Sequence, residues 1–226
     1  MIFMHKIQRF NYKQYEIWRS HQCVEYKASL KIMEERVQKI RLGYVKPTIW
    51  LLEHPDTYTA GALTQKSDYP ESLSQMVIPI DRGGKLTYHG PGQLVVYVMI
   101  PLTERHKDVR KFIESLESYT IEILRAHNIR NAFASREKVG IWINSKESPN
   151  KQAKIAAIGI KIRQWITSHG LAININPDLA KFDPIIPCGL PNAKTTSIQT
   201  INPQIKKEEV IETAHALAHS FLSQYL

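Results

Sequence analysis

The sequence is poor in cysteine and has no long apolar run. Cys23 and Cys188 are its only cysteines, too few for a disulfide framework and too few to hold a zinc ion by themselves. No window approaches the roughly 18 apolar residues of a membrane span, and no basic segment precedes an apolar stretch at the N-terminus. We therefore expect a cytoplasmic protein with no membrane association, no signal peptide and no metal.

Acidic side chains are in the minority. Lys and Arg number 30 against 21 Asp and Glu, which gives a formal net charge of +9. Such a surplus fits an acidic protein, a nucleic acid or an anionic membrane. The basic residues are scattered rather than striped, and the sequence carries no helix-turn-helix, zinc-finger or RNP-type signature, so we expect no nucleic-acid partner.

The chain shows no internal repeat and no low-complexity segment. Its 226 residues, 43% hydrophobic and 23% charged, are typical of an ordinary globular protein. A chain of this length buries about 70% of its unfolded surface, enough for a core without covalent staples. Residues 145–152 are polar and could form a break, but the segment is short enough for a hairpin loop. We predict a single domain over residues 1–226.

Helical periodicity of apolar residues is present in three segments. The first contains Asn11 and Gln14, which could form a capping box, and it ends before Gly43. Cys23 lies inside this segment and is expected to be packed. The predicted helices span residues 11–42, 108–127 and 207–226.

Short runs rich in β-branched residues predict strands between these helices. The last four runs follow one another with short turns, which favours antiparallel hairpins over crossover helices. Strands and helices are partly segregated along the chain, so we predict an α+β fold with a mixed, largely antiparallel β-sheet flanked by helices. The predicted strands are 48–53, 77–80, 94–100, 139–144, 154–162, 164–168 and 171–175.

Glycine is scarce, yet four of the ten glycines fall within residues 82–93, RGGKLTYHGPGQ. Glycine allows a positive φ and lets a ligand approach the backbone closely. Because the segment lies between two predicted strands and carries Arg82, Lys85 and His89, we interpret it as a loop whose amides line a pocket. A wide hairpin turn is the alternative. The segment lacks the spacing of a phosphate-binding loop.

Cys188 is a candidate nucleophile. A free cysteine is most often a small buried hydrophobic residue. Here Pro187 and Gly189 flank the cysteine and favour a turn that exposes its sulfur over a core strand. A thiol attacks as the thiolate, so a catalytic Cys188 needs a neighbouring cation or base.

Three residues could assist Cys188. Lys154 begins an otherwise apolar run, and a lysine held in a medium of low dielectric constant gives up its proton more readily. His89 and His169 are alternatives, and His169 with Gly170 is expected to form a turn. The spacing of these residues does not choose among them, and a solvated Lys154 at a strand end is also consistent with the sequence.

Four motifs together resemble one family. Their order and spacing are similar to those of the octanoyltransferases of lipoate biosynthesis, over about Tyr12 to Ser197, and the first motif combined with the last is highly specific. One position departs from the family: Ala62 stands where the pattern Thr-x-Gly-Arg commonly has arginine. The motifs are RGGKLTYHGPGQ at 82–93, KIAAIG at 154–159, HGLAININ at 169–176 and IPCG at 186–189.

The resemblance implies a cofactor-free acyl transfer. Family members move an octanoyl (or lipoyl) group from acyl carrier protein to one lysine of a lipoyl domain. The acceptors are the E2 subunits of 2-oxoacid dehydrogenases and the glycine cleavage H protein. By this resemblance Cys188 matches the nucleophile that forms a thioester intermediate, and Lys154 matches the lysine that activates it. The implied fold is that of biotin and lipoate protein ligases.

The resemblance also implies the walls of an acyl-binding pocket, with His169 in a supporting role. An ATP-dependent ligase of the same fold is the main alternative, but such ligases need no cysteine nucleophile, so Cys188 favours the transferase. The basic surplus then fits an acidic carrier protein. The implied binding residues are Arg82, Gly83, Gly84, Lys85, Leu86, Thr87, Tyr88, His89, Ala157, Ile158, Gly159, Gly170, Leu171 and Ala172.

Overall fold

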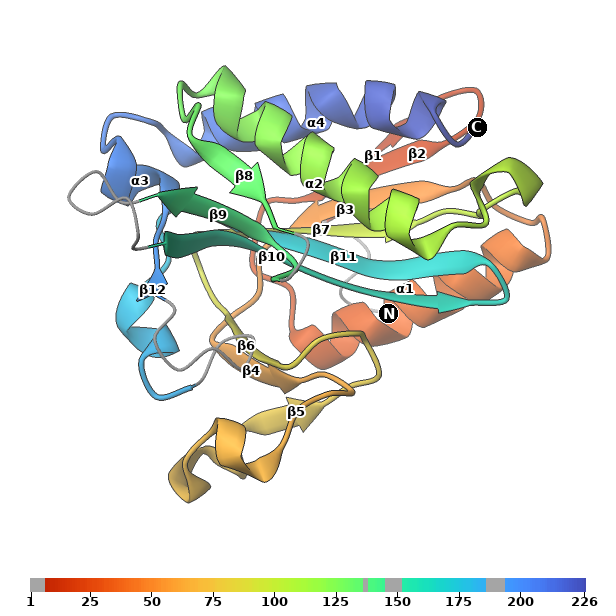
Figure 1. Cartoon of the computed structure of the whole chain (residues 1–226). Helices are drawn as coiled ribbons and strands as arrows, with labels where there is room; N and C mark the ends of the chain where they lie inside the picture. The colour runs from red at the N-terminus through yellow and green to blue at the C-terminus, as the bar shows by residue number, and fades with distance from the viewer. Residues whose placement is uncertain (1–6, 136–137, 145–151, 186–193) are drawn as a thin grey trace.

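A nine-stranded mixed sheet forms the centre of the computed structural model, which describes residues 7–135, 138–144, 152–185 and 194–226. Its order is β1-β2-β3-β7-β11-β10-β9-β8, and β12 pairs with β10 (Figure 1). The β2–β3 and β10–β12 pairs are parallel and the other pairs are antiparallel. The strands are β1 (Ile7–Asn11), β2 (Glu16–Ser20), β3 (Thr48–Leu52), β7 (Gln93–Met99), β8 (Ala132–Ala134), β9 (Ile141–Asn144), β10 (Gln152–Arg163), β11 (Ile166–Asn174) and β12 (Lys194–Thr195).

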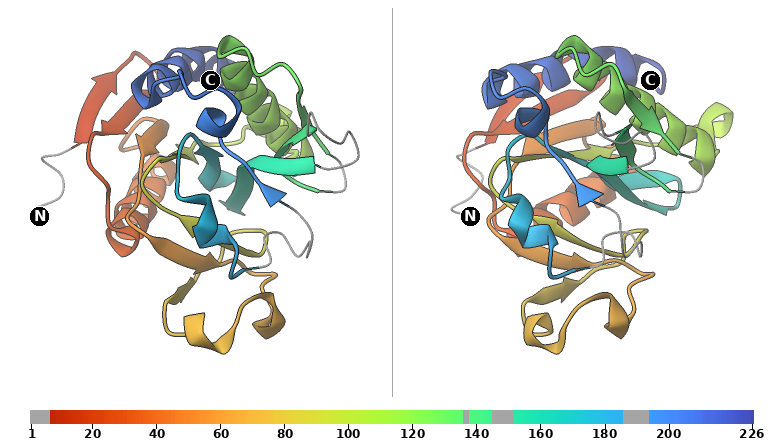
Figure 2. Two further views of the ribbon diagram at one scale, coloured as in Figure 1. Left: turned by 90° about the vertical axis from the view of Figure 1, so that its left-hand side faces the viewer. Right: turned by 60° about the vertical axis from the view of Figure 1, so that its left-hand side comes forward.

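Helices cover both faces of this sheet, which confirms the predicted α+β fold. One face is covered by α2 and α4, and we call it the α2–α4 side (Figures 1 and 2). The other face is covered by α1, and a small sheet of order β5-β4-β6 lies beyond it; this is the α1 side. The α-helices and the strands of the small sheet are α1 (Tyr26–Arg41), α2 (Val109–Ala126), α3 (Ile198–Ile201), α4 (Lys207–Ser223), β4 (Thr57–Ala60), β5 (Val77–Pro79) and β6 (Leu86–His89).

Strand β7 shows how one strand supplies two cores. Successive side chains of a strand point to opposite faces. Val96 and Val98 accordingly belong to the core on the α2–α4 side, whereas Val95 and Tyr97 belong to the core on the α1 side. Because both faces of the sheet are covered at β7, the sequence of this strand is a nearly continuous apolar run.

Helices α2 and α4 form where the sequence predicts them. Asp108 caps α2, since its carboxylate accepts hydrogen bonds from the backbone N–H groups of Arg110 and Lys111. The Tyr119 hydroxyl of α2 donates to the Ala214 carbonyl of α4 at 2.6 Å. The two helices therefore pack on each other as well as on the sheet.

The predicted helix over residues 11–42 is wrong in its first half. Residues 7–20 form the β1–β2 hairpin, and α1 begins only at Tyr26. Ile17 and Trp18 are buried on opposite faces of β2, which pairs in parallel with β3, so tertiary pairing overrides local propensity. The Asn11–Gln14 capping box does not form, and Cys23 precedes α1 and is exposed rather than packed.

Two further predictions need correction. The glycine-rich segment predicted as a loop contains strand β6, which pairs with β4. His169 and Gly170 form no turn: the predicted strands 164–168 and 171–175 are one strand, β11, paired along its length with β10. Strands β4, β8 and β12 were not predicted. The expected hairpin loop at 145–152 lies, up to residue 151, outside the described residues.

Candidate active site

A cavity of about 60 Å³ lies between the β10–β11 hairpin, the glycine-rich segment, α1 and β7. Two glycines let these segments meet. Gly84 has φ +83°, which favours glycine. A Cβ on Gly159 would lie 3.1 Å from the Gly83 carbonyl oxygen and from Arg82 Cδ, so a larger residue would push β10 and that segment slightly apart.

The cavity collects most of the binding residues that the resemblance implies. All of them line it except Gly83 and Tyr88. The Gly83 N–H donates to the Ile160 carbonyl at 2.8 Å and so ties the segment to β10. Tyr88 donates from its hydroxyl to Asp56 and packs on Phe182 in the core of the small sheet. Both residues support the wall without lining it.

Three lining residues were missed by sequence reasoning: Tyr26, Val95 and Tyr97. Tyr97 and Val95 alternate on β7, but nothing in the sequence tells which face of that strand holds a ligand. Tyr26 belongs to α1, far from any motif. Leu171, an expected lining residue, does line the cavity, although its side chain belongs to the core on the α2–α4 side.

Arg82 is the buried cation of the cavity wall. Its guanidinium donates to the Thr59 carbonyl and hydroxyl at 3.2 and 2.9 Å and to the Gly83 carbonyl at 2.9 Å. These bonds hold the glycine-rich segment against β4. Ala62, the position without the family arginine, is exposed and donates its N–H to the Arg82 carbonyl.

Three buried histidines lie in this part of the molecule: His89 and His169 near Arg82, and His54 beside the His89 ring, with ring centroids 5.8 Å apart. Burial lowers the pKa of His54 to about 4. Burial, and to a lesser extent the Arg82 charge, lower the pKa of His169 to about 4 as well. Burial also holds the pKa of His89 well below its usual value. At neutral pH the three imidazoles are therefore uncharged, and each offers one donor and one acceptor nitrogen.

A chain of buried hydrogen bonds runs from His89 to the backbone of Lys154. His89 Nδ1 lies 2.7 Å from Gln93 Oε1, and Gln93 Nε2 donates to Asn174 Oδ1 at 2.9 Å. Asn174 Nδ2 donates to the Thr196 carbonyl at 3.1 Å, and the Thr196 N–H donates to the Lys154 carbonyl at 2.9 Å.

Carbonyl groups fix the direction of this chain. The Thr196 carbonyl can only accept, so Asn174 presents its oxygen to Gln93. Gln93 Nε2 also donates to the Tyr88 carbonyl, so Gln93 presents its oxygen to His89. His89 must then carry its proton on Nδ1, which leaves Nε2 as a hydrogen-bond acceptor. Gln93 and Asn174 are thus positioning residues that the sequence prediction missed, although both lie within quoted motifs.

Lys154 lies on β10, three residues before the cavity wall begins, and it does not line the cavity. Its side chain is buried: Nζ donates to the Val139 carbonyl at 2.8 Å and lies 4.9 Å from the ring centroid of Trp142. The β9–β10 register shifts between Lys154 and Ala156, and such bulges redirect side chains next to active sites.

Gly140 provides the space for this lysine. A Cβ there would lie 2.9 Å from Lys154 Cε and 3.0 Å from Nζ, and Gly140 has φ +123°. Any larger residue would displace the amine. Sequence reasoning missed Gly140 because its role depends on a neighbouring strand.

Cys188, the predicted nucleophile, lies outside the described residues, so its relation to Lys154 stays a prediction. The chain that follows it enters β12, whose Thr195 pairs with Lys154 in parallel register. Among the described residues, no three His, Cys, Asp or Glu side chains form a group that could hold a metal ion. Within the residues that the structure describes, no helix is long and apolar enough to cross a membrane.

The fold is shared with solved structures of lipoate protein ligases. A bipartite lipoate protein ligase from Thermoplasma acidophilum matches with a TM-score of 0.68 over 93% of this chain and 83% of its own, at 12% identity. Lipoate-protein ligase A bound with ATP matches with a TM-score of 0.60 over 79% and 73% of the two chains, at 14% identity. At such identities the likeness defines the fold alone.

Sequence comparison defines the family. The model of the lipoyl protein ligase A/B catalytic domain matches residues 25–218. The octanoyltransferase of Bartonella tribocorum is 39% identical over 208 residues, covering 89% of this chain and 83% of the relative. The octanoyltransferase of Cereibacter sphaeroides is 41% identical over 192 residues, covering 82% and 87%. The chain belongs to the lipoyl protein ligase A/B catalytic-domain family and, within it, groups with the octanoyltransferases.

Proposed function

We propose that this protein transfers an octanoyl group from the thioester of an acyl carrier protein to a lysine of a lipoyl domain, through a thioester on Cys188. The observation that carries the proposal is the buried Lys154, placed on the strand that also walls the cavity and beside the strand that follows Cys188. The named octanoyltransferases, similar over most of the chain, support the same reaction.

In the first step the Cys188 thiol passes its proton to Lys154 and attacks the carbonyl carbon of the donor thioester. The bond to the carrier thiolate breaks, and that thiolate takes the proton from Lys154. One thioester replaces another, so the step is nearly balanced in free energy. Splitting the transfer in this way separates two reactions that each need only two partners.

In the second step the neutral amine of the acceptor lysine attacks the Cys188 thioester. An amide forms, the Cys188 thiolate leaves, and Lys154 carries the proton lost by the amine back to that thiolate. General acid–base groups of this kind contribute about 10²–10⁴-fold to rate. The neutral histidines of the cavity wall remain uncharged throughout.

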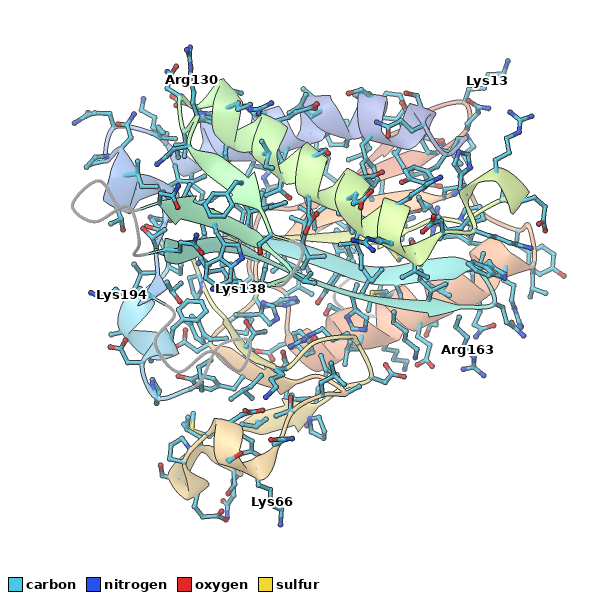
Figure 3. The ribbon with its side chains drawn as sticks, in the orientation of Figure 1. Lys13, Lys66, Arg130, Lys138, Arg163 and Lys194 are labelled. Carbon is cyan, nitrogen blue, oxygen red and sulfur yellow. The ribbon has the colours of Figure 1, made fainter. Side chains whose placement is uncertain are left out.

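The partners are those that the resemblance to octanoyltransferases implies. We infer an acidic acyl carrier protein as donor, and the lipoyl domains of 2-oxoacid dehydrogenase E2 subunits or the glycine cleavage H protein as acceptors. Lys194, at the start of β12, is exposed and projects from the end of the molecule where β12 meets β10 (Figure 3). A basic side chain there fits an acidic carrier that delivers its thioester near Lys154.

Mass spectrometry tests the proposal directly. Incubation with octanoyl-carrier protein alone should raise the intact mass by one octanoyl group, and Cys188→Ala should prevent it. Adding an apo lipoyl domain, with no ATP, should then move the octanoyl group to the domain. Transfer that requires ATP would instead favour a ligase, and acylation that persists in Cys188→Ala would overturn the role of the cysteine.

A further inference from the structure

His169 has an unusual backbone for its place in the fold. It pairs with Ile160 in the middle of the β10–β11 hairpin, yet its φ is +57°. Residues with a side chain rarely adopt this left-handed conformation, and it persists only where the surroundings hold it. Strained backbone of this kind is concentrated at functional sites.

The left-handed backbone coincides with a break in the alternation of β11. Leu171, two residues on, points into the core of the α2–α4 side, and a regular strand would send residue 169 the same way. The His169 ring instead packs edge-on against Tyr97, which belongs to the α1 side, with ring centroids 6.0 Å apart. The His169 N–H lies 3.1 Å from the sulfur of Met33 in α1.

This orientation places His169 between two cavities. The small cavity of about 60 Å³ described above lies on one side of it. A second cavity, of about 500 Å³, lies under α1 and is bounded by the end of β5 and the far part of the β10–β11 hairpin. Of the described residues, His169 is the one that lines both.

The second cavity has a mixed lining, in which apolar side chains lie beside polar and charged ones. Lys161 forms an ion pair with Asp81, so its charge is already compensated. Arg163 and Glu34 are exposed at the rim. The apolar part of this lining can contact a methylene chain. Its apolar lining consists of Leu30, Met33, Val37, Pro79, Ile80 and Ile166.

Strand β10 passes Lys154, the small cavity and the second cavity in that order. Lys154 comes first, residues 157–159 wall the small cavity, and Lys161 and Arg163 border the second. Figure 3 accordingly shows Arg163 at the opposite end of the molecule from Lys194, which lies beside the Lys154 end of the strand. An acyl group with its carbonyl carbon near Lys154 therefore points its tail toward His169.

We propose that the His169 side chain sets the longest acyl chain this protein accepts, by closing the small cavity against the larger one beyond it. Octanoyl ends before the ring, whereas a longer chain would have to displace it. The inference rests on the proposed function, since it takes the acyl carbonyl to lie near Lys154. It makes His169 a specificity-determining residue and assigns the second cavity to the tail of a longer chain once the ring is removed.

His169→Gly tests this without adding strain, because glycine adopts φ +57° readily. Rates are measured with octanoyl, dodecanoyl and tetradecanoyl carrier thioesters, and calorimetry measures the binding of the free fatty acids to the same proteins. We expect the dodecanoyl-to-octanoyl ratio to rise at least tenfold, since each additional buried methylene favours binding about fourfold. His169→Asn, which also tolerates a left-handed backbone, should move the ratio in the same direction by less.

A second substitution tests whether the gain with dodecanoyl comes from access to the second cavity or from a general loosening of the fold. Adding Val37→Trp to His169→Gly refills the second cavity from α1, and we expect the gain with dodecanoyl to disappear while the octanoyl rate of the parent variant is kept. His169→Phe keeps a ring in place and should leave the ratio low.

An unchanged ratio in both His169→Gly and His169→Asn would overturn the proposal, as would a gain that Val37→Trp does not reverse. These outcomes are distinct from a failure of the proposed function. In that case the wild-type protein would not transfer octanoyl at all, while the fatty-acid binding measurements would still report whether the two cavities join.

Discussion

The two sides of the large sheet are built from different kinds of residue. On the α2–α4 side, Leu116 and Ile123 pack against the sheet in an apolar core. On the α1 side, the space next to the sheet holds His54, His89 and Arg82, all buried and hydrogen-bonded. On the α2–α4 side apolar burial supplies stability, whereas on the α1 side part of the interior is occupied by buried polar groups in and beside the cavity. Changes on the two sides should therefore separate stability from activity.

The largest expected effect is on activity alone. Lys154→Arg keeps a positive charge but cannot transfer a proton, so we expect turnover to fall by about 10³-fold or more. Thermal unfolding should confirm that the variant is folded. Lys13→Arg, the same change at an exposed position, is the matched control. A Lys154→Arg rate near that of the wild type would refute proton transfer by this residue.

The next effect is on stability alone. Leu116 is fully buried in the core on the α2–α4 side, and Leu116→Ala should lower the free energy of unfolding by about 2–5 kcal/mol. Urea unfolding measures the loss. Well below the midpoint of unfolding, the octanoyl-transfer rate per folded molecule should stay near the wild-type value, and a large drop in that rate would contradict the separation of the two sides.

The buried histidines predict an acid-sensitive α1 side. The unfolded chain binds a proton to His54 near pH 6.5, but the folded protein binds one only near pH 4. The stability associated with the neutral ring is therefore fully present above about pH 6.5 and is lost as the pH falls toward 4, by about 2 kcal/mol at pH 5.

Unfolding measured between pH 7 and pH 5 tests this contribution. In His54→Asn, which has no group that titrates there, the free energy of unfolding should depend on pH less steeply, by up to about 1.4 kcal/mol per pH unit. Parallel pH profiles for the two proteins would show that His54 is not the source.

A smaller effect is expected for the hydrogen-bond chain. Asn174→Leu has a similar volume but removes the bonds to Gln93 and to the Thr196 carbonyl, which should cost about 1–3 kcal/mol of stability. The transfer rate should fall further than stability alone explains, because His89 and the Lys154 backbone lose their common support. Asn131→Leu, at an exposed position, is the control. Equal transfer rates in Asn174→Leu and Asn131→Leu would show that the hydrogen bonds of Asn174 contribute to stability but not to catalysis.

The smallest effect concerns the surface. Lys194→Glu should raise the KM for the acyl carrier protein a few-fold at low salt, and the difference should vanish at high salt because exposed charges are screened. Lys13→Glu makes the same charge change on the far side of the molecule (Figure 3). If both variants behave alike, net charge rather than a local contact is responsible.

Sequence reasoning reached the parts of the fold that depend on local periodicity. Helices α2 and α4 were predicted because their apolar residues recur at helical spacing, and β7 because a doubly buried strand is a continuous apolar run. The β1–β2 hairpin was missed because its burial depends on pairing with β3, about thirty residues further along the chain.

The residues of the candidate site were predicted from sequence motifs, not from their positions in space. The glycine-rich segment and residues 157–159 were found, yet Gly140 was missed because it matters only through Lys154 on another strand. Tyr26 was missed for the same reason, since its helix reaches the cavity only in the folded chain.

By itself, the sequence determined the helices and strands with strong periodicity, the family and the residue types available for acyl transfer, because spacing and motifs are local properties of the chain. The tertiary structure alone decided how these residues meet. Gln93 and Asn174 are 81 positions apart yet hydrogen-bonded, and His169 separates two cavities through a left-handed backbone that its neighbours hold in place. Such contacts depend on the packing of distant segments, which no local pattern encodes.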